Sequence, residues 1–152
     1  MALRRLQRGS NDVVIDADET RPLLDVLRAE LGVRSASRGC QDGSCGACRV
    51  LLDGVLVASC NVRWADVRDG AKVETYEDVA LDPAAVRAVD AFGVERPTRC
   101  KMCVGALGVT AVAVARTTGG DVEGREDAIE AALVGATCMC TGRGSWRRAL
   151  SK

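Results

Sequence analysis

The residues of this sequence best suited to chemistry are its eight cysteines, which fall into two sets of four. The first set lies in the amino-terminal half and the second in the carboxyl-terminal half: Cys40, Cys45, Cys48 and Cys60, then Cys100, Cys103, Cys138 and Cys140. Neither the apolar segment nor the cleavage site of an export signal follows Arg4-Arg5. We therefore expect a cytoplasmic protein, in which clustered thiols more often bind metal than form disulfides.

The first set has the spacing of a plant-type [2Fe–2S] ligand run, because its first three members are separated by four residues and then by two. Three thiolates must converge on one small inorganic core, so the backbone has to wrap closely around it. The loop contains glycines that permit this, namely Gly39, Gly43 and Gly46. A zinc site of four cysteines more often has two C-x-x-C pairs. The pattern therefore favours an iron–sulfur cluster here.

The second set combines a C-x-x-C pair with a C-x-C pair. Cys100 and Cys103 precede a helix expected over about 104–118, where the positive end of the helix dipole favours thiolates. Cys138 and Cys140 precede another expected helix, so four thiolates would meet at one end of a helical bundle. By spacing alone, zinc and an iron–sulfur cluster both remain open at this second site.

The elements that must position these cysteines differ between the two halves. Alternating β-formers and the Asp53-Gly54 hairpin signal predict a small mixed sheet with one helix, which suggests a β-grasp layout. Its strands are expected over 3–7, 13–17, 49–52, 55–58 and 72–75, and its helix is expected to be capped by Thr20 and closed by Gly32. Alanine-rich periodicity then predicts a bundle of four helices, over about 83–92, 104–118, 125–134 and 145–150. The linker is expected over 77–81.

Composition excludes several other classes of function. Lys+Arg and Asp+Glu both total 21, so there is no net charge to attract nucleic acid. The longest uncharged stretch, Met102–Ala115, is shorter than the ~20 residues that a transmembrane helix needs. The chain has no histidine, which excludes Rieske or haem ligation by that residue. No catalytic residue is identified, and the tryptophans, Trp64 and Trp146, are interpreted as packing or interface residues.

Further motifs accompany the two cysteine sets in a fixed order. They are Thr20-Arg21-Pro22-Leu23-Leu24-Asp25-Val26-Leu27-Arg28, the loop Gly39-Cys40 through Cys45-Gly46-Ala47-Cys48, Cys60, the Cys100/Cys103 pair, and Cys138-Met139-Cys140-Thr141-Gly142. Together they resemble the small iron–sulfur subunit of the xanthine oxidase family of molybdenum hydroxylases, which includes aerobic carbon monoxide dehydrogenase. The similarity covers nearly the whole chain.

The resemblance implies an α+β protein with two [2Fe–2S] clusters. A plant-type ferredoxin-like β-grasp domain over residues 1–76 would hold the first, and an all-α four-helix domain over 82–152 would hold the second. In the family, a large subunit carries molybdopterin and oxidises the substrate, and a medium subunit carries FAD and takes the electrons onward. The small subunit is an electron-transfer link without a substrate site, in a dimer of heterotrimers. Cys140 would lie closest to the pterin.

Several residues depart from the family pattern beside the second set, among them Arg99, Lys101 and Met139. Arg99 stands where a glutamine usually contacts the pterin, Lys101 replaces a glycine, and Met139 separates the C-x-C pair. Arg99 would either hydrogen-bond the anionic cofactor or face solvent or a partner's carboxylate. Two other functions also remain open: a scaffold or sensor with one cluster and one zinc, and a free-standing ferredoxin.

Overall fold

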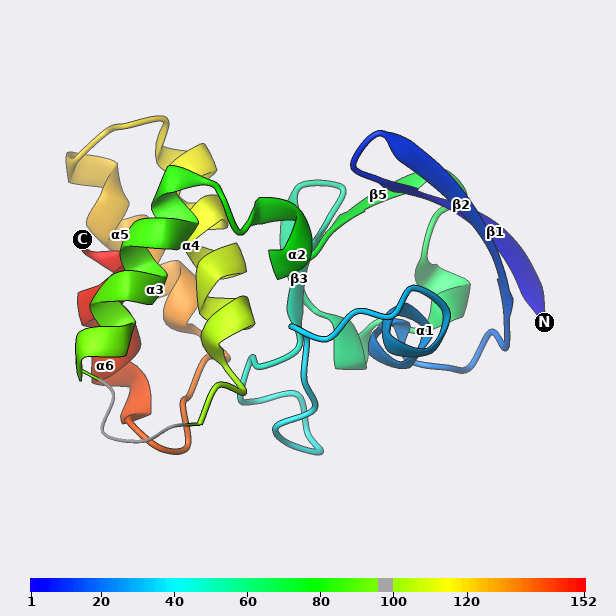
Figure 1. The fold of residues 1–152 in the computed structure, drawn as a ribbon, viewed down its shortest axis with the longest axis horizontal. Helices are drawn as coiled ribbons and strands as arrows, with labels where there is room; N and C mark the ends of the chain where they lie inside the picture. The colour runs from blue at the N-terminus through cyan, green and yellow to red at the C-terminus, as the bar shows by residue number, and fades with distance from the viewer. Residues whose placement is uncertain (96–99) are drawn as a thin grey trace.

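The computed structural model describes residues 1–95 and 100–152 and arranges them as a sheet followed by a group of helices. In Figure 1 the strands lie on one side of the molecule and the helices α3 to α6 on the other. This order of elements confirms the expected α+β class. Within the described residues, no helix is both long and apolar enough to cross a membrane.

The sheet has five strands in the order β2-β1-β5-β3-β4. The strands are β1 (Ala2–Arg8), β2 (Asn11–Ala17), β3 (Arg49–Leu52), β4 (Val55–Ala58) and β5 (Ala71–Glu74). The last strand, β5, pairs in parallel with β1 and antiparallel with β3, so it closes the sheet between the two hairpins. Helix α1 (Leu23–Glu30) buries its leucines against this sheet in one core with Leu6, Ile15 and Val73. This is the β-grasp arrangement.

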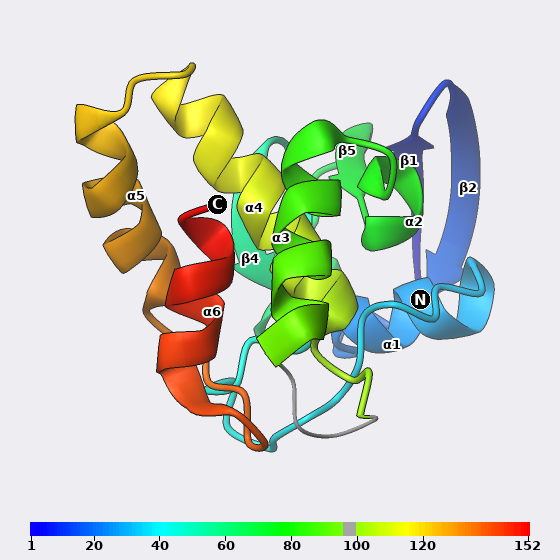
Figure 2. The same cartoon turned by 60° about the vertical axis from the view of Figure 1, so that its left-hand side comes forward.

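Four helices form the second half: α3 (Pro83–Glu95), α4 (Val104–Thr118), α5 (Glu123–Leu133) and α6 (Gly142–Leu150). Helix α4 packs against α3 and α5 and is buried over most of its length, because nearly every position carries a small or apolar residue. The turned view in Figure 2 shows α4 between α3 and α5, with α6 closing the group. Its core includes Phe92, Leu107, Ile129 and Trp146.

Several expected boundaries shift in the structure. Thr20 does not cap α1, because its hydroxyl donates to Asp18 Oδ1 at 2.6 Å and Pro22 occupies the cap position instead. Helix α3 continues through Gly93, which was expected to end it. Helix α6 begins at Gly142 rather than about residue 145, so the second cysteine pair directly precedes it.

The expected linker contains a short helix, α2 (Tyr76–Val79), that the sequence analysis missed. A capping box stabilises it, since Thr75 and Asp78 bond to each other's backbone N–H groups. Val79 then joins Leu51 of β3 and the α4 residues Val109 and Val112 in a buried cluster between the two halves. The sheet and the helices are thus packed against each other, while their division at residues 76 and 82 stays a prediction.

Glu77 of α2 anchors the loop that leads toward the first cysteine set. Its carboxylate accepts hydrogen bonds from the N–H groups of Arg34 (2.8 Å) and Ser35 (2.9 Å) and from the Ser35 hydroxyl (2.5 Å). Burial alone would raise the pKa of Glu77, but the bonds from Ser35 and Arg34 outweigh it and lower that pKa to about 2. The ionised form is therefore the one that stabilises the fold.

We expect Glu77→Gln to lower the free energy of unfolding by about 0.5–1 kcal/mol at pH 7, because a charged acceptor is lost and solvent screens part of its effect at this exposed position. A folded-state pKa below the ordinary 4.5 means that this contribution is complete above pH 4.5 and is lost as the pH falls toward about 2. Urea unfolding of both proteins across pH 7 to 3 measures the difference. The exposed carboxylate of Glu19 provides the control Glu19→Gln. A difference that does not shrink below pH 4.5 would contradict this role.

Candidate metal centres

The first cysteine set gathers at the end of the β3–β4 hairpin. Cys48 directly precedes β3, and Cys60 lies in a 3₁₀ turn, Ser59–Asn61, directly after β4. Because Arg49 pairs with Ala58 across the hairpin, the two cysteines leave it at the same end. The Ser59 hydroxyl fixes this junction by donating to the Cys48 carbonyl at 2.6 Å. The hairpin therefore brings Cys60 back beside Cys48 and the loop that precedes it.

Backbone N–H groups in the loop point at cysteine sulfurs. The N–H of Cys45 donates to Cys40 Sγ at 3.5 Å, and that of Ala47 donates to Cys45 Sγ at 3.4 Å. The bond from the Cys45 N–H lowers the pKa of Cys40, so it favours the thiolate. A Cβ placed on Gly39 would lie 2.9 Å from Cys45 Sγ, so the loop has no room for a side chain there. A compact cradle of thiols with inward N–H donors suits a [2Fe–2S] cluster.

The second cysteine set meets where α4 and α6 begin. Cys103 occupies the cap position of α4, and Cys138 and Cys140 precede α6. Together with Cys100 they line a cavity of about 260 Å³. Burial and the neighbouring Cys138 raise the pKa of Cys103 to about 12. The pKa of Cys138 is lowered instead, because hydrogen bonds from Thr141 and the Cys140 N–H outweigh the effect of its burial.

The two sets lie against each other. Cys45 of the first set lines the same cavity as the second set. The N–H of Thr137 donates to the Cys45 carbonyl at 2.9 Å. Gly46 has a φ of +75°, and a Cβ on it would come within 2.6 Å of the Gly135 carbonyl oxygen. Backbone therefore packs on backbone between the two loops, which lie side by side in Figures 1 and 2.

Each set has a buried side and a more exposed side. Cys45 and Cys48 are buried in the first, whereas Cys40 and Cys60 are partly exposed. In the second set Cys103 and Cys138 are buried, whereas Cys100 is partly exposed and Cys140 is exposed. Since Cys45 faces the second set, the two centres meet within the protein, and each also has cysteines accessible from outside.

Arg49 joins the sheet to the helices and was not identified in the sequence analysis. It follows Cys48 directly, yet only 7% of its surface is exposed. Its guanidinium donates to the carbonyls of Ala132 and Val134, both at 2.5 Å, and so caps the end of α5. Burial lowers the pKa of Arg49, but an arginine remains charged in proteins. In the sequence, Arg49 is a charged residue at the start of a strand, next to apolar Val50 and Leu51. Nothing in that pattern indicates a contact with the end of α5.

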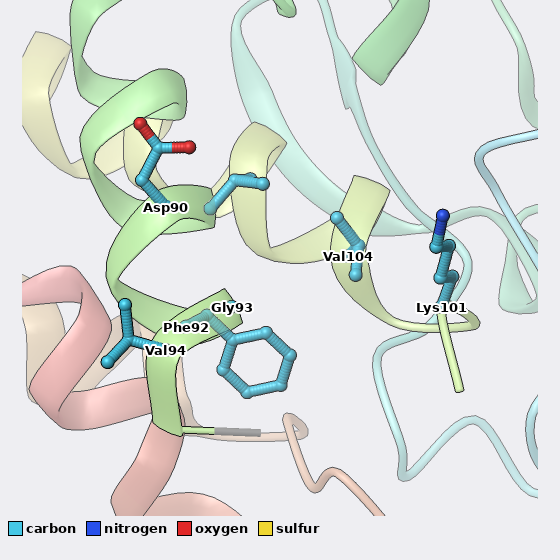
Figure 3. Close-up of a pocket in the computed structure, with 7 residues that line it drawn as sticks. Asp90, Phe92, Gly93, Val94, Lys101 and Val104 are labelled. Atoms are coloured by element: carbon cyan, nitrogen blue, oxygen red, sulfur yellow. The ribbon is translucent and has the colours of Figure 1, made fainter. Parts of the chain in front are cut away.

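The departures from the family pattern lie on the surface or outside the described residues. Arg99, the predicted pterin contact, falls in the segment 96–99, which lies outside them. Lys101 and Met139 are exposed, Met139 to 82%. Figure 3 shows a nearby hollow of about 590 Å³ between the end of α3 and the start of α4. Phe92 and Val104 line it beside Lys101, and no cysteine does, so it is separate from both centres.

In residues 1–95 and 100–152, no three cysteine, aspartate or glutamate side chains converge tightly enough to hold a single metal ion. The assignment of the cysteines to two sets therefore rests on the shared cavity, on the hairpin junction and on the influence of neighbouring cysteines on each other's pKa. Cys48 helps to raise the pKa of Cys60, after burial, to about 12, and Cys138 does the same for Cys103.

Comparison with known proteins shows which family the chain is similar to. Residues 7–80 match the model of a 2Fe-2S iron-sulfur cluster binding domain. The chain is 35% identical over 130 residues to the nicotine 6-hydroxylase small subunit of Paenarthrobacter nicotinovorans, covering 86% of this chain and 74% of the relative. It is 32% identical over 124 residues to the xanthine dehydrogenase iron-sulfur-binding subunit of Escherichia coli O157:H7, covering 80% and 74%.

Solved structures extend the similarity over both halves. The aldehyde oxidoreductase of Desulfovibrio gigas superimposes on 99% of this chain with a TM-score of 0.81 and 27% identity. This chain spans only 16% of that longer chain. The relatives are therefore either separate small subunits or a small part of a large oxidoreductase, which agrees with an electron-transfer role rather than with a scaffold or sensor.

Proposed function

The chain belongs to the small iron–sulfur subunits of the xanthine oxidase family of molybdenum hydroxylases, and from this premise we propose that it conducts electrons from a molybdopterin centre in a large subunit to FAD in a medium subunit. Two [2Fe–2S] clusters would supply the one-electron transfers when bound. The protein's own residues hold the clusters, exclude water between them and present a cysteine to each partner. The subunit contributes no substrate site of its own.

The observation that carries this proposal is that the loops of the two cysteine sets pack against each other. The Thr137 N–H bonded to the Cys45 carbonyl fixes one loop against the other. Buried cysteines of both sets, Cys45, Cys103 and Cys138, line the cavity that the sets share, and each set also has partly or fully exposed members. A protein that transfers electrons between two partner proteins needs its two centres close together in the interior. It also needs part of each centre to be accessible at the surface that the partner binds.

We assign one cluster to each cysteine set. The first would be held by Cys40, Cys45, Cys48 and Cys60, and the second by Cys100, Cys103, Cys138 and Cys140. Thiol-directed N–H groups in the first loop would stabilise the negative charge of the bound cluster. For the second, the Thr141 and Cys140 groups that lower the pKa of Cys138 would act in the same way.

The partners follow from this assignment. Cys140 is exposed beside Met139, so we propose that this end faces the molybdopterin subunit and the first centre faces the FAD subunit. Arg99 is proposed, on sequence grounds, to hydrogen-bond the anionic pterin cofactor. The complex would be a dimer of heterotrimers in the cytoplasm.

Metal analysis of the purified native complex tests the proposal. We expect about four iron atoms and no zinc per small subunit, and two distinct EPR signals after dithionite reduction. The same preparation should contain a molybdopterin subunit and an FAD subunit. About two iron atoms with one zinc would refute the second cluster, and purification of the chain by itself would instead support a free-standing ferredoxin.

A further inference from the structure

Trp146 of α6 is fully buried beside the second cysteine set. Its side chain has 0% exposure and belongs to the same core as Cys103 and Cys138. The indole nitrogen, Nε1, is itself buried, and within the described residues no acceptor lies within hydrogen-bond geometry of it. Trp146 therefore brings an unsatisfied donor into the core that contains Cys103 and Cys138.

A buried donor without an acceptor is unusual, because leaving it unpaired costs the free energy of its lost hydration. The other tryptophan of the chain shows the ordinary solution. Trp64 is equally buried, and its Nε1–H donates to the Ala2 carbonyl at 2.8 Å. The fold thus satisfies the indole of Trp64 and leaves that of Trp146 without an acceptor in the part of the chain that the structure describes.

Cys103 is buried in the same core as the Trp146 indole, so its sulfur is the acceptor that this donor could reach. Burial is the main influence on the pKa of Cys103 and raises it, whereas the neighbouring Trp146 side chain lowers that pKa, which is the direction expected of a donor beside the sulfur. A neutral thiol is a weak acceptor, but a cluster-bound thiolate is a much stronger one. Binding of a cluster would therefore create the acceptor that the indole lacks.

Arg49 holds the indole ring in place. Its guanidinium carbon lies 6.0 Å from the centroid of the Trp146 ring, which is within the range of a cation–π contact. The guanidinium is fixed in turn by the carbonyls of Ala132 and Val134. The ring is confined between this charge and the helical core, so its N–H has a fixed direction.

We propose that Trp146 Nε1–H donates a hydrogen bond to the Cys103 thiolate of the second cluster and thereby raises the reduction potential of that cluster. The inference rests on the proposed function and adds a residue that sets the potential of one centre. Reduction adds one electron to the cluster and increases the negative charge on its ligands, so a donor stabilises the reduced form more than the oxidised form. The indole keeps its proton throughout.

The test is an EPR-monitored titration of the native complex with dithionite, comparing wild type with Trp146→Phe, which retains an aromatic ring but lacks the N–H. At a fixed ambient potential, the ratio of reduced to oxidised second cluster should fall about threefold to tenfold, where tenfold corresponds to about 59 mV for a one-electron couple. The first cluster should be unchanged. Trp64→Phe, which also removes a buried indole N–H, should shift neither the first nor the second cluster.

Two further measurements keep the inference testable. If Trp146→Phe loads too little iron, benzothienylalanine at position 146 keeps the bicyclic ring and replaces the N–H with sulfur. In resonance Raman spectra, a cluster Fe–S stretching band of the wild type should shift in D₂O, and this shift should be smaller in either variant, because only the indole donor has been removed. An unchanged potential in an iron-loaded variant overturns the inference while leaving the proposed function intact. Absence of a second EPR signal in the wild type refutes the proposed function itself.

Discussion

Cys103→Ser is expected to abolish the second EPR signal and to slow reduction of the flavin by substrate more than about 100-fold, while the first signal persists. Cys103 is buried at the start of α4, where burial raises its pKa to about 12. A serine hydroxyl is still harder to deprotonate than this thiol and is a poorer ligand for iron. The second cluster should therefore not form, and the route between the two partner subunits would be interrupted.

Ala106→Ser is the matched control, because it also places a hydroxyl on a buried position of α4 without removing a thiol. Iron content, EPR and stopped-flow reduction of the flavin are measured on both complexes. If Cys103→Ser retains about four iron atoms and reduces its flavin at the normal rate, Cys103 is not a ligand on the route.

Arg49→Met is expected to lower the free energy of unfolding by about 2–4 kcal/mol. Methionine fills similar space, but the carbonyls of Ala132 and Val134 lose their donor at the end of α5. The weak bond to Thr110, at 3.4 Å, is lost as well. Buried acceptors that lose a charged donor retain the cost of their dehydration, which explains why the effect exceeds that of an ordinary surface substitution.

Arg116→Met provides the comparison, because Arg116 also bridges the helices and the sheet. It pairs with Glu74 of β5 at 2.9 Å, but about half of its side chain is exposed. Only 10% of the Glu74 side chain is exposed, but Glu74 keeps its second partner, Lys72, at 3.5 Å, so we expect a smaller loss of about 1–2 kcal/mol. Urea unfolding of the two variants measures both effects. Equal losses would show that Arg49 does not join the halves more strongly than this half-exposed pair.

The fold could be anticipated from local patterns in the sequence. The Asp53-Gly54 turn and the apolar alternation around it predicted β3 and β4 at their observed bounds. Boundaries that depend on side-chain partners were less accurate. Thr20 has the chemistry of a helix cap but bonds to Asp18 instead, and the short α2 was missed because its capping box lies in a segment without apolar periodicity.

The sequence by itself determined the number of cysteines and the spacing of the first set, because ligand spacing around a small cluster is a local property of its loop. Only the tertiary structure decided that the loops meet through Gly46 and Gly135 and that Arg49 is buried between the halves. Arginine is ordinarily a surface residue. Its burial depends on carbonyls at the end of α5, more than eighty positions away. Contacts of that kind arise from the packing of distant segments, which no local pattern contains.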